Sequence, residues 1–159
     1  MLRVGLGRDV HRLVRGRRLI LGGVCVDEDR GCVAHSDGDC LAHALMDALL
    51  GAAALPNVGV LFPNTDEANR GRNSLEMMEE VVQIVLGSGL RVANVDAVIQ
   101  LETPILQPFM EPMRKNLSRA LSLDGGRIGL KATTAEGLGP VGAGEAVEVC
   151  GICLLEARG

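Results

Sequence analysis

Three residues are of types that commonly bind metal ions, and their spacing would allow two structural elements to bring them together. Asp9 and His11 stand two apart in a segment predicted to be a strand, where alternate side chains point to the same side. His43 lies in a predicted helix. One carboxylate and two imidazoles suit zinc, with one coordination position left open for a substrate. Alternatively, Asp9 and His11 are ordinary exposed strand residues, and His43 acts as a cap or packs in the core. Spacing alone leaves both interpretations open.

The predicted helix also carries a carboxylate one turn before and one turn after His43. Asp39, His43 and Asp47 recur every four residues, so they stack on one face, and an apolar stripe is expected on another. Such carboxylates could orient a ligand or support the local structure without binding the metal. Ser36, three residues before Asp39, predicts the start of this helix.

A second group of chemically capable residues follows a predicted strand near the C-terminus: Lys131, Thr133, Thr134 and Glu136. Backbone amides at a helix start, two hydroxyls and a lysine suit the oxygens of a phosphate group. Glu136 could hold a hard cation such as Mg²⁺ between phosphates. Thr133 and Glu136 also have the spacing of a capping box, and a helix capped in this way would still present its amides.

Length and composition indicate one globular domain spanning 1–159, large enough to bury roughly two-thirds of the surface of the unfolded chain. Two Phe, no Tyr and no Trp nearly exclude base stacking on aromatic side chains. A net charge of −4 argues against nucleic acid or an anionic membrane as a partner. The longest apolar region, 41–62, is interrupted by polar residues and a proline, so no membrane span is expected.

Five cysteines without paired spacing indicate a reduced, cytoplasmic protein. Cys150 and Cys153 lie in an apolar run predicted to be the closing strand. Residues three apart on a strand face opposite sides, so we interpret the two as buried core thiols and not as a metal-binding or redox pair. Gly5 and Gly7 do not continue into a dinucleotide-binding fingerprint and are interpreted as points of close backbone approach.

Periodicity and turn residues predict strands, then a helix, a helix, a strand, a helix and two closing strands. This order predicts an α+β fold with a mostly antiparallel sheet and helices on one face, in a ferredoxin-like layering. The expected strands are 2–11, 19–21 paired with 24–26, 91–102, 127–132 and 145–156, and the expected helices are 38–54, 73–87 and 108–121.

Several longer motifs occur in order along nearly the whole chain. They are Asp9-Val-His11, Leu21-Gly-Gly-Val24, Ala34-His-Ser-Asp-Gly-Asp39, Asp47-Ala-Leu-Leu-Gly-Ala-Ala-Ala-Leu55, Leu61-Phe-Pro63 and Lys131-Ala-Thr-Thr134. In these motifs the chain closely resembles the 2-C-methyl-D-erythritol 2,4-cyclodiphosphate synthase family of the non-mevalonate isoprenoid pathway. The resemblance implies cyclisation of 4-diphosphocytidyl-2-C-methyl-D-erythritol 2-phosphate, with release of CMP.

The same resemblance implies a homotrimer with active sites between subunits. It implies zinc on Asp9, His11 and His43, and a second divalent cation, Mg²⁺ or Mn²⁺, on Glu136. The residues carried over for the methylerythritol pocket are His35, Ser36, Asn57, Gly59, Asn64 and Asp66; for the cytidine pocket, Pro104, Leu106, Ala132 and Thr133; for catalysis, Lys131, Thr134 and Glu136.

The chain departs from the family pattern at several positions, among them Leu6 and Arg8 near the metal ligands. Asn57 and Asn64 stand where Asp is usual, Ile105 where Lys is usual, and Ala143 where Arg is frequent. An amide keeps one acceptor but loses the charge and any role as a base. The substitutions at 57, 64 and 105 motivate one alternative, a catalytically weakened trimeric zinc-binding module. A generic zinc hydrolase is another, although no H-E-x-x-H arrangement supplies a general base.

Overall fold

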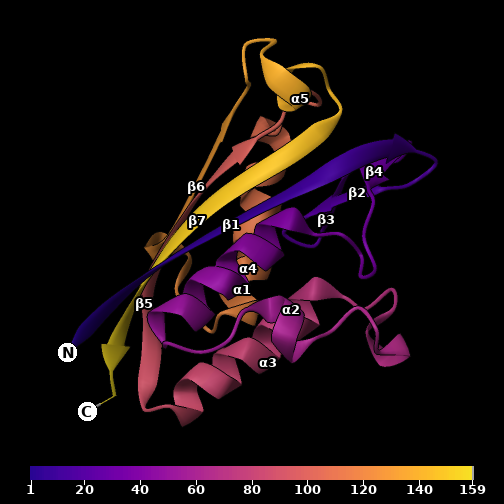
Figure 1. Cartoon of the computed structure of the whole chain (residues 1–159). Coiled ribbons are helices and arrows are strands. Elements are labelled where there is room, and N and C mark those ends of the chain that lie inside the picture. The colour runs from indigo at the N-terminus through magenta and orange to yellow at the C-terminus, as the bar shows by residue number, and fades with distance from the viewer. Residues whose placement is uncertain (159) are drawn as a thin grey trace.

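One mixed β-sheet with helices against one face makes up the fold, in a computed structural model that describes residues 1–158 (Figure 1). The strands are β1 (Leu2–Arg15), β2 (Leu19–Leu21), β3 (Val24–Asp27), β4 (Arg30–Cys32), β5 (Leu90–Gln100), β6 (Ile128–Thr133) and β7 (Ala146–Ala157). The α-helices are α1 (Cys40–Ala52), α2 (Val58–Leu61), α3 (Ser74–Gly87), α4 (Met110–Ala120) and α5 (Gly139–Gly142). No helix in residues 1–158 is long and apolar enough to cross a membrane.

The main sheet has the strand order β4-β1-β7-β5-β6. β1 pairs antiparallel with β4 and β7, and β5 pairs antiparallel with β7, as the mostly antiparallel prediction requires. β5 and β6 are parallel, which the sequence analysis did not predict. The parallel pair is possible because α4 lies between these strands in the chain and provides the crossover connection. β2 and β3 form the predicted hairpin through Gly22 and Gly23.

Two glycines allow α1 to lie directly against β1. A Cβ atom on Gly5 would stand 1.9 Å from the carbonyl oxygen of Ala48, and one on Gly7 would stand 2.0 Å from that of Ala44. Larger residues would therefore push the helix off the strand, and the predicted close backbone approach is confirmed. Because Asp9 follows Gly7 by two residues, its side chain points to the same covered face.

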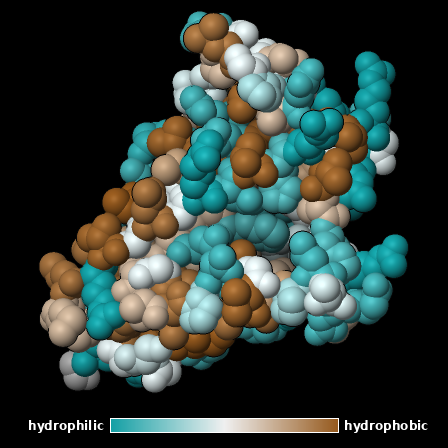
Figure 2. All heavy atoms as spheres, in the orientation of Figure 1, coloured by the Kyte–Doolittle hydropathy of each residue, from teal (hydrophilic) through white to brown (hydrophobic). Residues whose placement is uncertain are grey.

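The opposite face of the sheet carries exposed apolar side chains. Leu2, Val4 and Leu6 on β1 are 64–68% exposed, and Ile152 on β7 is 42% exposed. Figure 2 shows apolar atoms along the left margin of the molecule, where β1 begins and β7 ends in Figure 1. Contiguous apolar surface of this kind is typical of a face that contacts another protein chain.

The first helix differs from the prediction in its start and in its burial. Asp39, and not Ser36, is the cap, with its Oδ1 accepting a hydrogen bond from Ala42 N at 3.0 Å. The helix is buried on nearly every side instead of along one stripe, because β1, β7, α3 and the β2–β3 hairpin surround it. Within α1, only His43, Asp47 and Gly51 reach the solvent.

The two cysteines of the closing strand face opposite sides, as predicted, but only one is a core thiol. Cys153 is 1% exposed and packs in the core. Cys150 is exposed, so its predicted burial is wrong. The reason is that Cys150 lies on the open face of the sheet, which no element of residues 1–158 covers, opposite Arg8 in the β1–β7 register.

Candidate active site

The three predicted metal ligands come together where β1 passes under the first turns of α1. His11 Nδ1 lies 3.0 Å from Asp9 Oδ2, and His43 Nδ1 lies 3.6 Å from the same oxygen. One ligand atom of each residue lies within 4.8 Å of the other two. Within residues 1–158, this is the one cluster of at least three His, Cys, Asp or Glu residues that could hold a metal ion.

Atoms of this triad are buried without ordinary hydrogen-bond partners. Asp9 Oδ2 and His11 Nδ1 have no solvent contact and no hydrogen bond. A buried polar atom without a partner is costly unless a ligand satisfies it. The geometry therefore suits a metal cation, and the donor set of one oxygen and two imidazoles suits a divalent transition metal.

The electrostatic environment also favours the metal-binding protonation states. Burial alone would raise the pKa of Asp9, but the attraction of the His11 and His43 rings, whose nearest nitrogens lie 3.0 and 3.6 Å from Asp9 Oδ2, holds it below its usual value. Burial lowers the pKa of His43, and Asp9 offsets this in part. A charged carboxylate and a neutral imidazole are the forms that bind metals.

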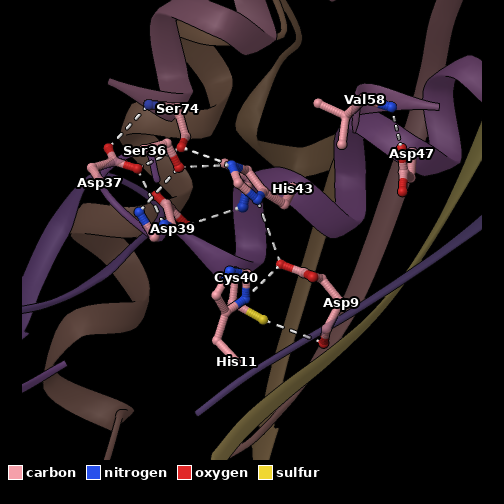
Figure 3. A network of polar contacts seen from close by, with 12 residues as sticks. Asp9, His11, Ser36, Asp37, Asp39, Cys40, His43, Asp47, Val58 and Ser74 are labelled. Atoms are coloured by element: carbon pink, nitrogen blue, oxygen red, sulfur yellow. Dashed lines mark hydrogen bonds and ion pairs between the residues drawn. The ribbon is translucent and has the colours of Figure 1, made fainter. Parts of the chain in front are cut away.

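The carboxylates on either side of His43 support the local structure (Figure 3). Asp39 is fully buried and accepts hydrogen bonds from the backbone amides of Gly22 and Gly23 at 2.9 and 2.7 Å, in addition to its cap on α1. Burial raises its pKa to about 6. Asp47 accepts from Val58 N at 2.8 Å and so ties α2 to α1. Both are structural carboxylates, one of the roles predicted for them.

A cavity of about 280 Å³ opens beside the metal triad. The predicted site residues that line it are Asp9, His11, His35, Ser36, His43, Gly59 and Asn64. His35 Nε2 is buried without a hydrogen-bond partner, so it is available to a bound molecule. Asn57 and Asp66 are outside this lining: Asn57 caps α2 through Val60 N, and Asp66 caps a short 3₁₀ turn through Ala68 N.

The remaining predicted site residues gather in a second place, at the ends of β5 and β6. The strands are parallel, so the loops that follow them emerge at the same edge of the sheet. Ala135 N donates to Glu102 Oε2 at 3.1 Å, which holds the two loops together. This group contains Pro104, Leu106, Lys131, Ala132, Thr133, Thr134 and Glu136, and none of them lines the cavity beside the metal triad.

Three residues of the second group differ from the prediction: Thr133, Lys131 and Leu106. Thr133 does not cap a helix, because β6 continues through Thr133 and α5 begins only at Gly139. Instead Thr134 Oγ1 donates to Glu136 Oε1 at 2.8 Å, in a turn where Glu136 has φ of 52°. Lys131 forms an ion pair with Asp96 on β5, which neutralises its charge within one chain. The side chain of Leu106 is buried in the core.

Two residues near His43 were not predicted from the sequence: Ser74, which contacts the imidazole, and Asp37, which contacts Ser74. Ser74, the first residue of α3, is fully buried, and its Oγ lies 3.1 Å from His43 Nε2. Asp37 accepts hydrogen bonds from both the backbone amide and the hydroxyl of Ser74. Asp37 lies inside the His35–Asp39 motif, which was a signal for it. Ser74 had no sequence signal beyond its place after a cap residue, because the residues that make its contact with His43 are 31 positions apart.

Comparison with known proteins places the chain in a family. It matches the YgbB family over residues 2–156. A 2-C-methyl-D-erythritol 2,4-cyclodiphosphate synthase from Synechococcus sp. (strain JA-2-3B'a(2-13)) is 48% identical over 157 residues, which cover 99% of this chain and 100% of that protein. The bifunctional IspDF from Campylobacter jejuni has a TM-score of 0.95 at 39% identity, covering 99% of this chain and 42% of that longer chain.

A second similar structure contains a bound ligand. It is a CDP-bound form of 2C-methyl-D-erythritol-2,4-cyclodiphosphate synthase, with a TM-score of 0.89 at 40% identity over 97% of this chain and 100% of that chain. The similarity extends over nearly the full length of both chains. The chain therefore belongs to the YgbB family, whose near relatives among curated proteins are 2-C-methyl-D-erythritol 2,4-cyclodiphosphate synthases.

Proposed function

We propose that this chain is a cyclase that converts 4-diphosphocytidyl-2-C-methyl-D-erythritol 2-phosphate into 2-C-methyl-D-erythritol 2,4-cyclodiphosphate and CMP. The observation that carries the proposal is the triad of Asp9, His11 and His43 in the wall of a cavity also lined by His35 and Ser36. An oxygen of the 2-phosphate attacks the β-phosphorus, the bond from that phosphorus to the bridging oxygen breaks, and CMP leaves with that oxygen. No water and no protein nucleophile is consumed.

Phosphoryl transfer of this kind asks the protein mainly for positioning and neutralisation of charge. Asp9, His11 and His43 would hold zinc, which supplies polarisation of the phosphate oxygens when bound. His35 offers its unpartnered Nε2, and Ser36 its hydroxyl, to the methylerythritol phosphate at the cavity wall. Asn64 can orient a substrate hydroxyl, but an amide cannot accept a proton from it.

Thr134 and Glu136, which belong to the second group of residues, would bind and orient the diphosphate of the substrate. Glu136 would bind Mg²⁺ or Mn²⁺ together with phosphate oxygens, which are the hard ligands that such cations prefer. Thr134 already orients the Glu136 carboxylate through its hydroxyl. Backbone at Pro104, Leu106, Ala132 and Thr133 would surround the cytidine, with Lys131 nearby. Ile105 is 79% exposed and leaves this loop without the usual lysine charge.

Replacing Glu136 by glutamine should separate the roles of the two metals. The Glu136→Gln variant is expected to keep its zinc, because the triad is untouched, and to lose turnover by about 100-fold as the second cation binds weakly. Steady-state rates over a Mg²⁺ titration, with zinc content measured in parallel, check this. Glu79→Gln, an exposed carboxylate on α3, is the control. Unchanged turnover in Glu136→Gln would remove Glu136 from the metal assignment.

We further propose that the chain assembles as a homotrimer with each active site between two subunits. One chain alone holds two separate halves of a site, the cavity beside the metal triad and the loops around Glu136. Assembly through the open sheet face would bury Leu2, Val4 and Leu6 and could bring one subunit's cavity to its neighbour's loops. When each subunit contacts the next through the same two surfaces, three subunits can form a closed ring in which no contact surface stays free.

A charge on the open sheet face should block this assembly without unfolding the chain. Leu6 is 68% exposed in the isolated chain, so Leu6→Glu removes no core contact but would bury a charge in the proposed interface. Sedimentation velocity is expected to show trimers for the parent chain and folded monomers for Leu6→Glu. Val60→Glu, at a 64% exposed position on α2, should stay trimeric. Trimers of Leu6→Glu would argue against this face.

Product analysis tests the function itself and separates it from the alternatives. Incubation of the purified chain with the diphosphocytidyl substrate and Mg²⁺ should release CMP and the cyclic diphosphate, both visible by phosphorus NMR. Linear phosphate products would favour the zinc hydrolase, and absence of CMP would favour the binding module. The family relationship supports the cyclase. We place it in the cytoplasm, consistent with five free cysteines in the described residues.

A further inference from the structure

Hydrogen bonds connect Asp37, Ser74 and His43 (Figure 3). Which atom donates in each bond follows from the number of hydrogens that each group carries. Ser74 Oγ lies 2.5 Å from Asp37 Oδ1 and 3.1 Å from His43 Nε2. A carboxylate can only accept hydrogen bonds, so the single proton of the Ser74 hydroxyl is directed to Asp37. Ser74 Oγ can then only accept from His43, which requires a hydrogen on His43 Nε2.

Further hydrogen bonds hold Asp37 and Ser74 in this arrangement. Asp37 Oδ2 accepts from Ser74 N at 3.0 Å, and Asp37 Oδ1 also accepts from Asp39 N at 3.1 Å. If Ser74 turned its proton towards His43, Asp37 would lose its charge-assisted bond from the hydroxyl of the buried Ser74. Ser36 Oγ, 3.3 Å from His43 Nε2, accepts from Gly38 N and can take a share of the same imidazole hydrogen.

A neutral imidazole with its hydrogen on Nε2 has its free lone pair on Nδ1. His43 Nδ1 is the atom that faces Asp9 Oδ2 in the triad, at 3.6 Å. We infer that Asp37 and Ser74 are positioning residues that fix the tautomer and ring orientation of His43, so that Nδ1 is presented to the metal. This inference rests on the proposed metal site, and it assigns a role to two residues that do not line the cavity.

A purely structural role is the competing explanation, since Asp37 and Ser74 also join the loop before α1 to the start of α3. Asn73 provides the matched control. It caps the same helix by accepting from Leu75 N at 2.8 Å, yet it is exposed and does not contact His43. A variant at Asn73 therefore disturbs the start of α3 but keeps Ser74 as the hydrogen-bond partner of His43.

Zinc affinity, measured by chelator competition, tests the inference without relying on turnover. Ser74→Ala is expected to weaken zinc binding by about 10- to 100-fold, the range for partners that orient a metal-binding histidine. Asp37→Asn should shift the affinity in the same direction, and Asn73→Ala should leave it within about twofold of the parent, since it removes only a helix cap. Equal losses in Ser74→Ala and Asn73→Ala, or no loss in Ser74→Ala, would overturn the inference.

Nitrogen NMR of the metal-free parent chain gives a second readout that needs no variant. The imidazole of His43 should show the hydrogen on Nε2, and Ser74→Ala should show a mixture of the two tautomers. A hydrogen on Nδ1 in the parent chain that still binds zinc would overturn this inference alone. Failure of the parent chain to bind zinc would instead overturn the metal site on which it depends.

Discussion

Replacement of His43 by alanine is expected to leave a folded chain that binds no zinc and has lost cyclase activity. His43 is one of three proposed ligands, and two ligands cannot close a stable tetrahedral site. Because the metal supplies several kcal/mol of charge stabilisation, turnover should fall on the order of 1,000-fold. Metal analysis of the purified variant and its rate of CMP release are the two measurements.

Asp47→Ala serves as the matched control for this prediction. Asp47 lies one turn further along α1 and is also half-buried, but its contact is with Val58 N, not with the triad. Its loss should loosen α2, which borders the cavity, and so lower turnover with zinc content unchanged. The metal assignment would be refuted by a His43→Ala variant that keeps both full zinc content and full turnover.

Adding a methyl group at Gly7 is expected to destabilise the fold and to misalign the metal triad together. A Cβ atom there would lie 2.0 Å from Ala44 O and 2.6 Å from Ala48 N, and both are backbone atoms that cannot rotate away. We expect Gly7→Ala to lower the free energy of unfolding by about 3 kcal/mol, the upper end of the usual cost of overpacking. Zinc affinity should fall as well, since Asp9 and His43 are placed by the same contact.

Gly51→Ala is the control for this second prediction, because it adds the same methyl group to the same helix. A Cβ atom at Gly51 would meet nothing within 4 Å. Alanine is favoured over glycine inside a helix by roughly 1 kcal/mol, so this variant should be neutral or slightly more stable. Urea denaturation of both variants decides the matter. Equal free energies of unfolding for Gly7→Ala and the parent chain would contradict the prediction, because they would show that α1 can move away from β1 at little cost.

The metal triad was predictable because each part of it depends on a local rule. A strand places Asp9 and His11 on one side by its period of two, and a helix places His43 at a fixed step from its neighbours. The hairpin and the cap at Asn73 are likewise local. Sequence patterns alone could not decide whether the strand and helix meet, and the resemblance to a family carried that step.

The features that were missed or wrong depend on contacts distant in sequence. Ser74 reaches His43 across 31 residues, and no periodicity signals such a pair. Cys150 was expected in the core because its strand is apolar, but the pattern of one strand does not say which sheet faces are covered. The parallel pairing of β5 with β6 depends on the path of α4, and the burial of α1 on nearly all sides depends on its neighbours.

The amides at positions 57 and 64 bear on how the substrate is held. Asn57 keeps the oxygen that caps α2, so loss of the charge usual at this position leaves that structural bond intact. Asn64 lines the cavity and offers both a donor and an acceptor. Binding of substrate hydroxyls is therefore compatible with both substitutions, and the proposed reaction needs no base at either position.

Subunit complementation can show whether two half-sites from different subunits form one active site. His43→Ala lacks a working metal triad, and Glu136→Gln lacks the second cation site, so each variant alone should be nearly inactive. Co-expression should form mixed trimers in which about a quarter of the sites combine an intact triad with an intact Glu136 loop, given random assembly. Recovery of about a quarter of the parent rate is the expected result. Mixed trimers as inactive as either variant alone would show that the two half-sites do not combine across subunits.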